Sequence, residues 1–582
     1  MYELIYNNSF FANFITSLIF LILISIFCFS KFYIKNRQII IFGNFQPIII
    51  FFLIFCIIFF LFNLIIYFNF YQYFKYILYF LSICFFLIWL FFSKKKSILL
   101  IKKEIFDLKK KYIILIFFLI FFLISILPIS DADSIAIHQY LSNYIYLSGL
   151  EDVNLKKNFE FTTLANSEIL LILSPILKSD NFGSQLNFFS IFLFYLIFSK
   201  SNKSFIFFIF SCPLIIFLIS TQKLQLFFSI LYLILFILVH QNLLKKKGEI
   251  FLFILLLSFY ASAKISYVLI AIPLFFYFLI LNKKNIYIIF VYSLIVFIIF
   301  FIPIFLIKLK FFGNPVSPFF TNFFDKNNEF IQYFALSLRS TEGWLITSSD
   351  LKIFLKPFIP TSMSKLSSSL GLLFLFQLFN FSLLKKTKFI PIIIIFLILI
   401  TGQLLPRYYF EAFLILSFFY TVKQNKLVNL TKFLQSSAVM ILSVSFLFIA
   451  YFKTNVVFAK KDFMNDFSYS FFNSSQYDDL NLVENILVFP QDRQSIFFKD
   501  NIYASRAINV KSLNSDRKQA ILSFLKENSI SYIIGNDDNF PNCIVLNKID
   551  DIYQKRSIRN FFLNERRKSY NVYLINANNC KL

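Results

Sequence analysis

The residues best suited to chemistry follow directly after a long apolar segment, in the stretch ILPISDADSIAIHQY at positions 126–140. Asp131 and Asp133 lie two positions apart there, and His138 follows them. A carboxylate that is partly desolvated by Phe and Leu neighbours has a raised proton affinity, so it could accept a proton from a hydroxyl nucleophile. The structural alternative is that Ser130 or Asp131 is the N-cap of a following helix, with Asp133 in its first turn beside the positive end of the helix dipole. We favour the chemical interpretation because ionisable groups at a hydrocarbon boundary are costly and mark working sites.

Three cations form a second group of candidates: Lys223 in STQKLQL, Lys264 in YASAKISY and Arg407 in QLLPRYYFEAF. We expect each to lie at the outward end of a membrane span, where the chain otherwise carries few basic residues. Contact with anionic lipid headgroups would explain each cation singly. As a set with Tyr408 they suit a phosphate site, in which the planar guanidinium of Arg407 would make a bidentate contact.

A metal site is less well supported than a phosphate site. The further carboxylates expected on the outer side are Glu151, Asp152, Glu168 and Glu411. A divalent cation held by Asp131 or Asp133, His138 and one of these is an alternative that stays open. The chain has no ligand spacing comparable to H-E-x-x-H, so we assign no metal ligands.

The elements that must position these residues are membrane spans. The chain has 582 residues, of which 59% are hydrophobic and 15% charged, a composition too apolar for one soluble core inside a polar shell. Many segments run for about 20 residues with almost no charge, the length that a helix needs to cross a bilayer. The fourteen predicted spans are 10–30, 47–68, 72–92, 112–130, 183–199, 205–220, 223–240, 249–263, 265–282, 285–308, 367–384, 389–405, 408–423 and 433–452.

The charge pattern predicts the orientation. Basic clusters occur in every second loop, at 31–37, 93–111, 241–248, 282–285, 385–388 and 423–426. By the positive-inside rule these loops face the cytoplasm, and both termini face outward. The formal net charge of +26 is therefore explained by membrane orientation, and no nucleic-acid partner follows from it. We expect a multi-pass membrane protein whose site faces outward.

Composition divides the chain into three predicted domains: N-terminal helices at 1–111, a membrane domain at 112–452 and a small α/β domain at 453–582. The membrane domain contains two long outer loops, 131–182 and 310–366. The first loop begins with a predicted helix at the membrane surface, SIAIHQYLSNYIYLSG. A second apolar run, SEILLILSPILKSD, is too short to span and is expected to lie along the surface or to re-enter the membrane.

The third domain contains β-type runs at 485–489, 530–534, 543–548 and 571–576, with a helix in SDRKQAILSFLKENS. Its Cys543 and Cys580 could pair in an oxidising compartment or stay free.

The first outer loop resembles that of a known family. The pattern P-x-x-D-A-D-S-x-x-x-H is formed here by Pro128, Asp131, Ala132, Asp133, Ser134 and His138. It is similar to the GT-C glycosyltransferases, in the bacterial branch related to protein O-mannosyltransferases and aminoarabinose transferases. The resemblance covers roughly residues 110–450. In that family the acid usually follows the first helix, whereas three further spans precede it here, and this odd number requires an outward N-terminus.

The resemblance implies a function and a role for each candidate residue. These enzymes transfer a sugar from a polyprenyl-phosphate donor to an envelope glycan, lipid or protein on the outer side of the membrane. Asp131 would be the general base that deprotonates the acceptor hydroxyl. Asp133 and His138 are the other catalytic candidates of this loop, and we expect His138 to position the acceptor or to form a hydrogen bond. The leaving lipid phosphate needs cationic stabilisation, which Lys223, Lys264 and Arg407 would supply.

Two other classes of membrane protein compete with this interpretation. A transporter or flippase of lipid-linked sugars would build a site at mid-membrane from helices broken by Gly or Pro, whereas this chain has only 9 glycines. An O-antigen ligase or polymerase would be expected to carry an arginine-rich outer loop, and Arg339 is the only arginine in 310–366. A scaffold or receptor would leave the acids and the outward cations unexplained.

Overall fold

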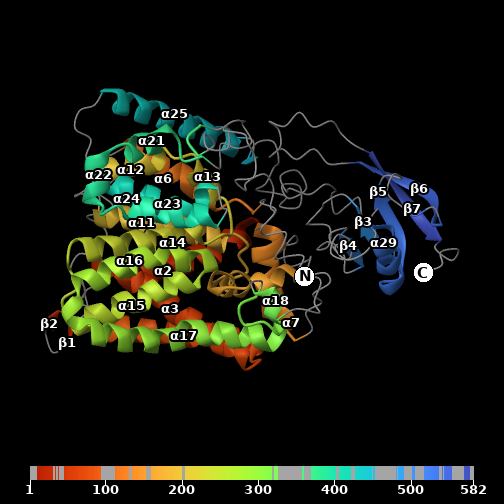
Figure 1. Cartoon of the computed structure of the whole chain (residues 1–582), viewed down its shortest axis with the longest axis horizontal. Coiled ribbons are helices and arrows are strands. Elements are labelled where there is room, and N and C mark those ends of the chain that lie inside the picture. Colours follow the sequence, from red (N-terminus) through yellow and green to blue (C-terminus); the bar gives the residue numbers. More distant parts are fainter. Residues whose placement is uncertain are drawn as a thin grey trace.

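The computed structural model describes residues 10–30, 33–34, 37–38, 45–92, 112–129, 134–151, 159–198, 203–317, 320–324, 357–359, 369–401, 405–420, 426–448, 450–451, 480, 483–489, 501–504, 517–535, 541, 543–553 and 569–576. Within these ranges the chain is a bundle of apolar helices with a separate β-sheet at one end (Figure 1).

The first part of the bundle contains the helices that precede and follow the first outer loop. They are α2 (Phe10–Phe29), α3 (Gln46–Tyr67), α4 (Phe74–Phe92), α6 (Tyr112–Ser125), α7 (Tyr140–Ser148), α9 (Asn166–Leu170), α10 (Leu173–Ile176) and α11 (Phe182–Phe198). Short helical turns η3 (Ser134–Gln139) and η4 (Phe159–Thr163) complete this loop. The predicted surface helix at 134–148 is therefore formed by η3 and α7. The second one is the pair α9 and α10, whose side chains are mostly buried in the protein.

The second part of the bundle continues with longer helices. They are α12 (Lys203–Phe210), α13 (Leu214–Ile219), α14 (Gln225–His240), α15 (Lys247–Ser262), α16 (Ile265–Leu281), α17 (Ile286–Phe312), α18 (Thr321–Phe324), α21 (Leu372–Leu378), α22 (Phe381–Lys386), α23 (Ile390–Ile400), α24 (Phe410–Phe419) and α25 (Lys426–Phe448). The turns η5 (Lys283–Asn285) and η7 (Pro406–Tyr409) precede α17 and α24.

Four helical segments are long and apolar enough to cross a membrane: Gln46–Tyr67, Tyr71–Phe91, Lys283–Phe312 and Lys426–Phe448. The other apolar helices are shorter. This architecture is compatible with the predicted class, a helical membrane protein. The number of fourteen spans stays a prediction.

Two predicted spans are broken in the structure. The segment 205–220 becomes α12 and α13, because Pro213 cannot donate a backbone hydrogen bond to a continuing helix. The segment 367–384 becomes α21 and α22, because the side chain of Asn380 accepts a hydrogen bond from the Leu383 backbone at 3.1 Å and starts a new helix. Each break therefore has a local cause in the sequence.

Helix α14 forms the centre of the bundle. Its residues 225–239 are all buried, and it packs against α11, α15 and α24. Because Leu, Ile and Phe occur on every side of this helix, it needs an apolar environment, which the neighbouring helices supply here. The loop that precedes α14 and the turn that precedes α24 thus meet at one end of the core.

The ends of the bundle differ in charge. The small strands β1 (Tyr33–Ile34) and β2 (Arg37–Gln38) and helix α22 carry residues of two basic stretches and lie at one end, whereas α7 and α18 lie at the opposite end (Figure 1). This arrangement agrees with the predicted orientation, in which both basic stretches share one side of the membrane.

The C-terminal part contains a mixed five-stranded sheet. Its strands are β3 (Asn485–Val488), β4 (Ile502–Ala504), β5 (Ile530–Gly535), β6 (Val545–Tyr553) and β7 (Ser569–Asn576), in the order β4-β3-β5-β7-β6. Strand β3 pairs in parallel with β4 and β5, whereas β7 is antiparallel to β5 and β6.

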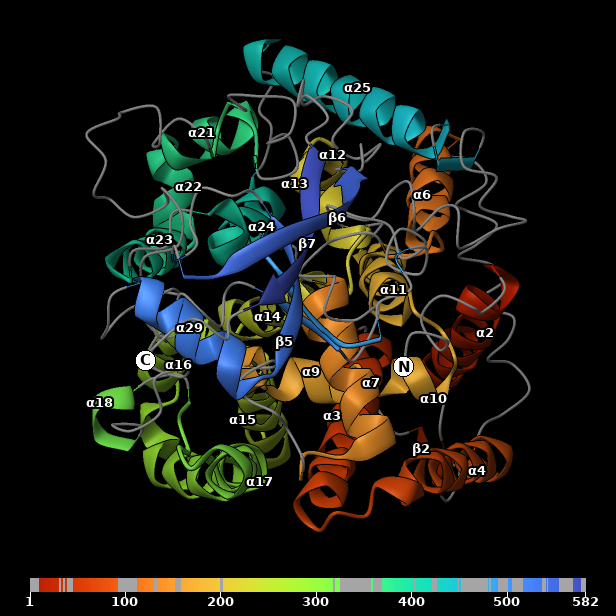
Figure 2. The same cartoon turned by 90° about the vertical axis from the view of Figure 1, so that its right-hand side faces the viewer.

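Helix α29 (Arg517–Glu527) contributes Ile521, Phe524 and Leu525 to a small core with Leu487 and Ile533. The sheet lies beside the end of the bundle that contains α7 and α9 (Figure 2).

The four predicted β-type runs correspond to β3, β5, β6 and β7, although β6 extends to Tyr553. Strand β4 was not predicted, because three residues are too few to show an alternating pattern. The domain boundaries at 111 and 452 stay predictions. Cys543 is disulfide-bonded, and Cys580 lies outside the described residues. The cysteines of the bundle, Cys28, Cys56, Cys84 and Cys212, are free thiols.

Candidate functional site

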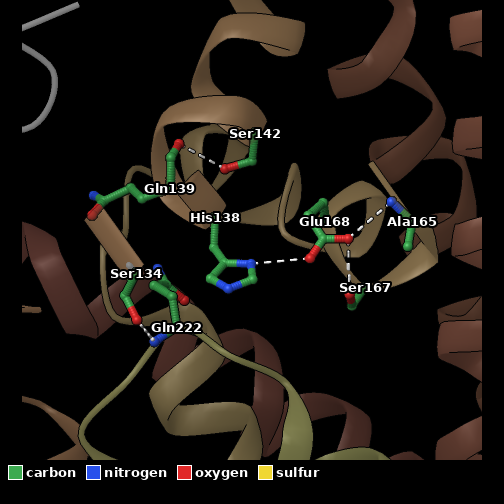
Figure 3. A network of polar contacts seen from close by, with 8 residues as sticks. All are labelled: Ser134, His138, Gln139, Ser142, Ala165, Ser167, Glu168 and Gln222. Carbon is green, nitrogen blue, oxygen red and sulfur yellow. Dashed lines mark hydrogen bonds and ion pairs between the residues drawn. The ribbon is translucent and has the colours of Figure 1, made fainter. Parts of the chain in front are cut away.

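His138 is held by a carboxylate from the second half of the first outer loop. Its Nδ1 lies 3.0 Å from Oε1 of Glu168, which begins the helical pair α9 and α10 (Figure 3). The other carboxylate oxygen of Glu168 accepts hydrogen bonds from the Ala165 backbone at 3.0 Å and from Ser167 Oγ at 2.9 Å. Both oxygens of this carboxylate therefore have partners, and the orientation of the imidazole is fixed.

The Glu168 carboxylate is charged despite its burial. Its residue is 6% exposed. Burial alone would raise the pKa, but the hydrogen bond and the charge of His138, together with Ser167, outweigh it and lower the pKa below the ordinary value. A carboxylate that keeps its charge can only accept hydrogen bonds, so the imidazole Nδ1 must be the donor in this pair.

The three predicted phosphate-binding cations come together around one tyrosine. The ammonium of Lys264 lies 4.6 Å from the ring centre of Tyr408, and the guanidinium carbon of Arg407 lies 5.2 Å from it. Arg407 also contacts the Tyr408 hydroxyl at 3.5 Å. Lys223 is close enough to interact electrostatically with both Lys264 and Tyr408. The cluster Lys223, Lys264, Arg407 and Tyr408, called the cation cluster below, is partly exposed.

Hydrogen bonds beside these residues hold the separate loops together. The Gln222 backbone donates to Ser134 Oγ at 3.1 Å, which joins the His138 helix to the residue before Lys223 (Figure 3). The Ser167 backbone donates to the Ala263 carbonyl at 3.3 Å, which joins the Glu168 segment to the residue before Lys264.

A third bond, from Gln225 Nε2 to the Arg407 carbonyl, joins the start of α14 to the turn before α24. The cations and the His138–Glu168 pair thus belong to one connected framework, even though they come from four parts of the chain.

Mutual repulsion and burial make this cluster ready to accept an anion. Burial lowers the pKa of Lys264, and the neighbouring Arg407 and Lys223 lower it further, while Tyr408 and Glu168 act in the opposite direction. The phenol of Tyr408 shows the complementary effect. Burial would raise its pKa, but Lys264 and Arg407 lower it to about 7. Cations that stabilise a phenolate would equally stabilise a phosphate oxygen.

Glu411 lies behind the cation cluster, on the first turn of α24. It is fully buried, and its Oε1 accepts hydrogen bonds from Ser229 Oγ at 2.7 Å and from the Tyr260 hydroxyl at 3.0 Å. The rings of Tyr260 and Tyr267 are stacked with their centres 4.7 Å apart, and Tyr267 interacts electrostatically with Glu411, Tyr408 and Arg407. This layer of buried polar groups supports the cluster from inside the bundle.

The structure describes only some of the predicted site residues. His138, Lys223, Lys264, Arg407 and Tyr408 are brought into one region. Asp131 and Asp133, together with Asp152, lie outside the described residues, so their predicted roles stay predictions. Glu151 lies elsewhere in the loop and accepts a hydrogen bond from Asn69. His240, the other histidine of the chain, packs against Phe236 and Phe419 at the far end of α14.

Two residues make contacts at the site that the sequence did not predict. The sequence indicates Glu168 only as one of several outer-loop carboxylates. Its place in ANSE, three residues after the N-cap position of a helix, does predict a hydrogen bond to the backbone there. Lys308, near the end of α17, interacts electrostatically with Glu168 and donates to the Ser317 carbonyl. Nothing in its sequence context distinguishes it from a basic residue at the end of a span.

The arrangement shows no metal centre within the described part of the chain, where no group of three or more His, Cys, Asp or Glu side chains could hold an ion. Comparison with known proteins gives no relative: no family model, no curated protein and no solved structure matches the chain.

Proposed function

We propose that this protein is a membrane glycosyltransferase that moves a hexosyl or pentosyl group from a polyprenyl-phosphate donor to an envelope glycan, lipid or protein acceptor. The site would face the periplasmic side of a bacterial inner membrane. The observation that supports this proposal most is the meeting of Lys223, Lys264 and Arg407 around Tyr408, next to the His138–Glu168 pair.

The chemistry of transfer fits these groups. As the acceptor oxygen attacks the anomeric carbon, the bond to the lipid phosphate breaks and negative charge grows on the phosphate. Cations that are held in advance by the fold stabilise that charge without having to reorganise. The acceptor hydroxyl must also lose its proton, and the resemblance of the first outer loop to GT-C enzymes gives this role to Asp131.

A lipid-linked donor also fits the rest of the chain. The cluster lies in a protein whose helices are apolar enough to contact lipid, so a polyprenyl chain could remain in the bilayer while its phosphate reaches the cations. A flippase would bind the same headgroup but would not break the sugar–phosphate bond. Release of polyprenyl phosphate from a sugar-linked donor therefore separates the two functions.

Substitution of the cations tests the proposal. Purified protein in nanodiscs would be given synthetic polyprenyl phosphates that carry glucose, galactose, mannose or arabinose, with bacterial membranes as the acceptor source. For Lys264→Gln or Arg407→Gln we expect the affinity for decaprenyl phosphate to fall about 10- to 100-fold, because one charged hydrogen bond contributes about 1.5–3 kcal/mol. Sugar transfer should fall at least as much.

The matched control is Lys284→Gln, which removes one charge from an exposed lysine in the turn η5. It should leave both binding and transfer unchanged. Equal losses in the control and the cluster variants would mean that decaprenyl phosphate responds only to overall charge. Failure of the unchanged protein to release polyprenyl phosphate from any of the four donors would reject the proposed function.

A further inference from the structure

The His138–Glu168 pair leaves one ring nitrogen available. Each other described partner of the Glu168 carboxylate is a hydrogen-bond donor, and the carboxylate can only accept, so in the neutral form of the imidazole the ring hydrogen lies on Nδ1. The other nitrogen, Nε2, then keeps its lone pair. Figure 3 shows the imidazole with its Nδ1 turned to Glu168 and its Nε2 turned away from it.

The ring that carries this second nitrogen is partly exposed. The His138 side chain is 19% exposed, whereas that of Glu168 is 8% exposed. Within the described part of the chain, Nε2 has no hydrogen-bond partner. The more buried member of the pair therefore orients the ring, and the less buried member turns its second nitrogen away from the carboxylate.

The pair is also linked, through hydrogen bonds of neighbouring residues, to two members of the cation cluster. Ser134, one helical turn before His138, accepts the hydrogen bond from Gln222, the neighbour of Lys223. Ser167, the neighbour of Glu168, donates to Ala263, the neighbour of Lys264. A ligand phosphate held by Lys223 and Lys264 would thus have the imidazole beside it.

We propose that His138, oriented by Glu168, is the proton acceptor of the transfer reaction, the role that the family resemblance gives to Asp131. This inference rests on the proposed function. The acceptor O–H bond breaks and its proton passes to Nε2. The acceptor oxygen forms a bond to the anomeric carbon, and the bond between that carbon and the phosphate oxygen breaks with its electron pair staying on the lipid phosphate. Glu168 stabilises the imidazolium until the proton is lost to water.

General considerations favour an imidazole for this step. Histidine titrates closer to neutral pH than a free carboxylate, so it can both take up a proton and release it in each cycle. A carboxylate that holds Nδ1–H fixes the tautomer and supports the positive charge that develops on the ring. His138 is in this assignment the catalytic residue, and Glu168 is a positioning residue.

The tautomer can be measured independently of the reaction, because the chain has only two histidines. In a His240→Gln background, protein labelled with ¹⁵N-histidine contains His138 as its single imidazole. We expect the neutral ring to show a protonated Nδ1 and an unprotonated Nε2 by NMR in nanodiscs. In Glu168→Gln the two tautomers should become mixed. A neutral ring that carries its hydrogen on Nε2 would overturn the proposal, whether or not a sugar donor is found.

Kinetics give the second test, with the sugar-linked polyprenyl phosphates named above. For His138→Gln we expect kcat to fall about 100- to 10,000-fold while KM for the donor changes little, because general-base catalysis contributes that much. Glu168→Gln should lower kcat about tenfold or more. Asp131→Asn should lower kcat less than His138→Gln does. A kcat of His138→Gln close to that of the unchanged protein would overturn the inference. If Lys264→Gln loses transfer while His138→Gln keeps it, the proposed function is still supported and only the role given to His138 is lost.

Discussion

Tyr408 combines a phenol with positive charge on two sides, from Lys264 over its ring and Arg407 at its hydroxyl. Because its pKa is lowered to about 7, the phenolate forms as the pH rises through neutrality. The phenolate neutralises cations that a bound anion would otherwise contact. We therefore expect sulfate to raise the melting temperature less at about pH 8.5 than at about pH 6. Sulfate keeps its charge over this range, and the two pH values lie about one unit or more on either side of the pKa of Tyr408.

The control for this prediction is Tyr408→Phe. Without the phenol, the stabilisation by sulfate relative to chloride should change little with pH. The sign of the effect on the protein itself is opposite: a tyrosine whose folded pKa is depressed from 10.0 stabilises the fold at high pH, and this contribution is lost as the pH falls through 7. A sulfate effect that weakens with pH equally in both proteins would contradict the role given to Tyr408.

At the residue scale, the sequence predicts the cations better than the acids. Lys223, Lys264 and Arg407 could be identified because each interrupts an apolar environment in which basic residues otherwise occur on one side only. The partner of His138 could not be predicted. Glu168 lies 30 positions away, and the sequence contains other outer-loop carboxylates that were equally suitable before the loop was folded.

At the element scale, Gly183 controls how closely α11 approaches the loop before α14. A Cβ at this position would lie 2.5 Å from the backbone oxygen of Gln222, a contact that no side-chain rotation can relieve. The same glutamine accepts a hydrogen bond from the Gly183 backbone at 2.7 Å and, through its own backbone, donates to Ser134. We expect Gly183→Ala to destabilise the protein by about 1–3 kcal/mol, as overpacking does, and to lower the affinity for decaprenyl phosphate.

Gly248 provides the matched substitution. It also lies in the first turn of a helix, α15, but a Cβ there would meet no atom within 4 Å. Gly248→Ala should be neutral or stabilise by up to about 1 kcal/mol, because alanine favours the helix. Thermal unfolding in nanodiscs compares the two variants. Similar melting temperatures for both would show that the loop before α14 moves easily, against the rigid framework described for the site.

The helices themselves were largely predictable because long apolar runs have one stable solution in lipid. Their breaks were less so. Asn380 and Pro213 act through backbone hydrogen bonds within a single turn, an effect that a window of about 19 residues averages out. The burial of α9 and α10 was also not predicted, since a short apolar helix at the membrane surface and one inside the protein have the same sequence pattern.

At the scale of the whole molecule, the sequence predicts orientation through charge, whereas the site depends on how distant loops meet. Strands β1 and β2 and helix α22 share one end of the bundle, and α7 and the C-terminal sheet share the other (Figure 1). The orientation in the membrane can therefore be tested by labelling one exposed position at each end of the bundle. Leu147, at the end of α7, is 46% exposed, and Lys385, in the last turn of α22, is exposed.

We predict that a membrane-impermeant maleimide labels Leu147→Cys in intact cells and labels Lys385→Cys only after the membrane has been permeabilised. A Cys84→Ser background is suitable, because, of the other described cysteines, Cys28, Cys56 and Cys212 are buried and Cys543 is disulfide-bonded. The physical reason is that the basic residues beside Lys385 retain that end of the bundle in the cytoplasm. Labelling of Lys385→Cys from outside, with Leu147→Cys protected, would reverse the orientation. It would place the cation cluster on the cytoplasmic side, where sugar nucleotides rather than lipid-linked sugars are the abundant donors.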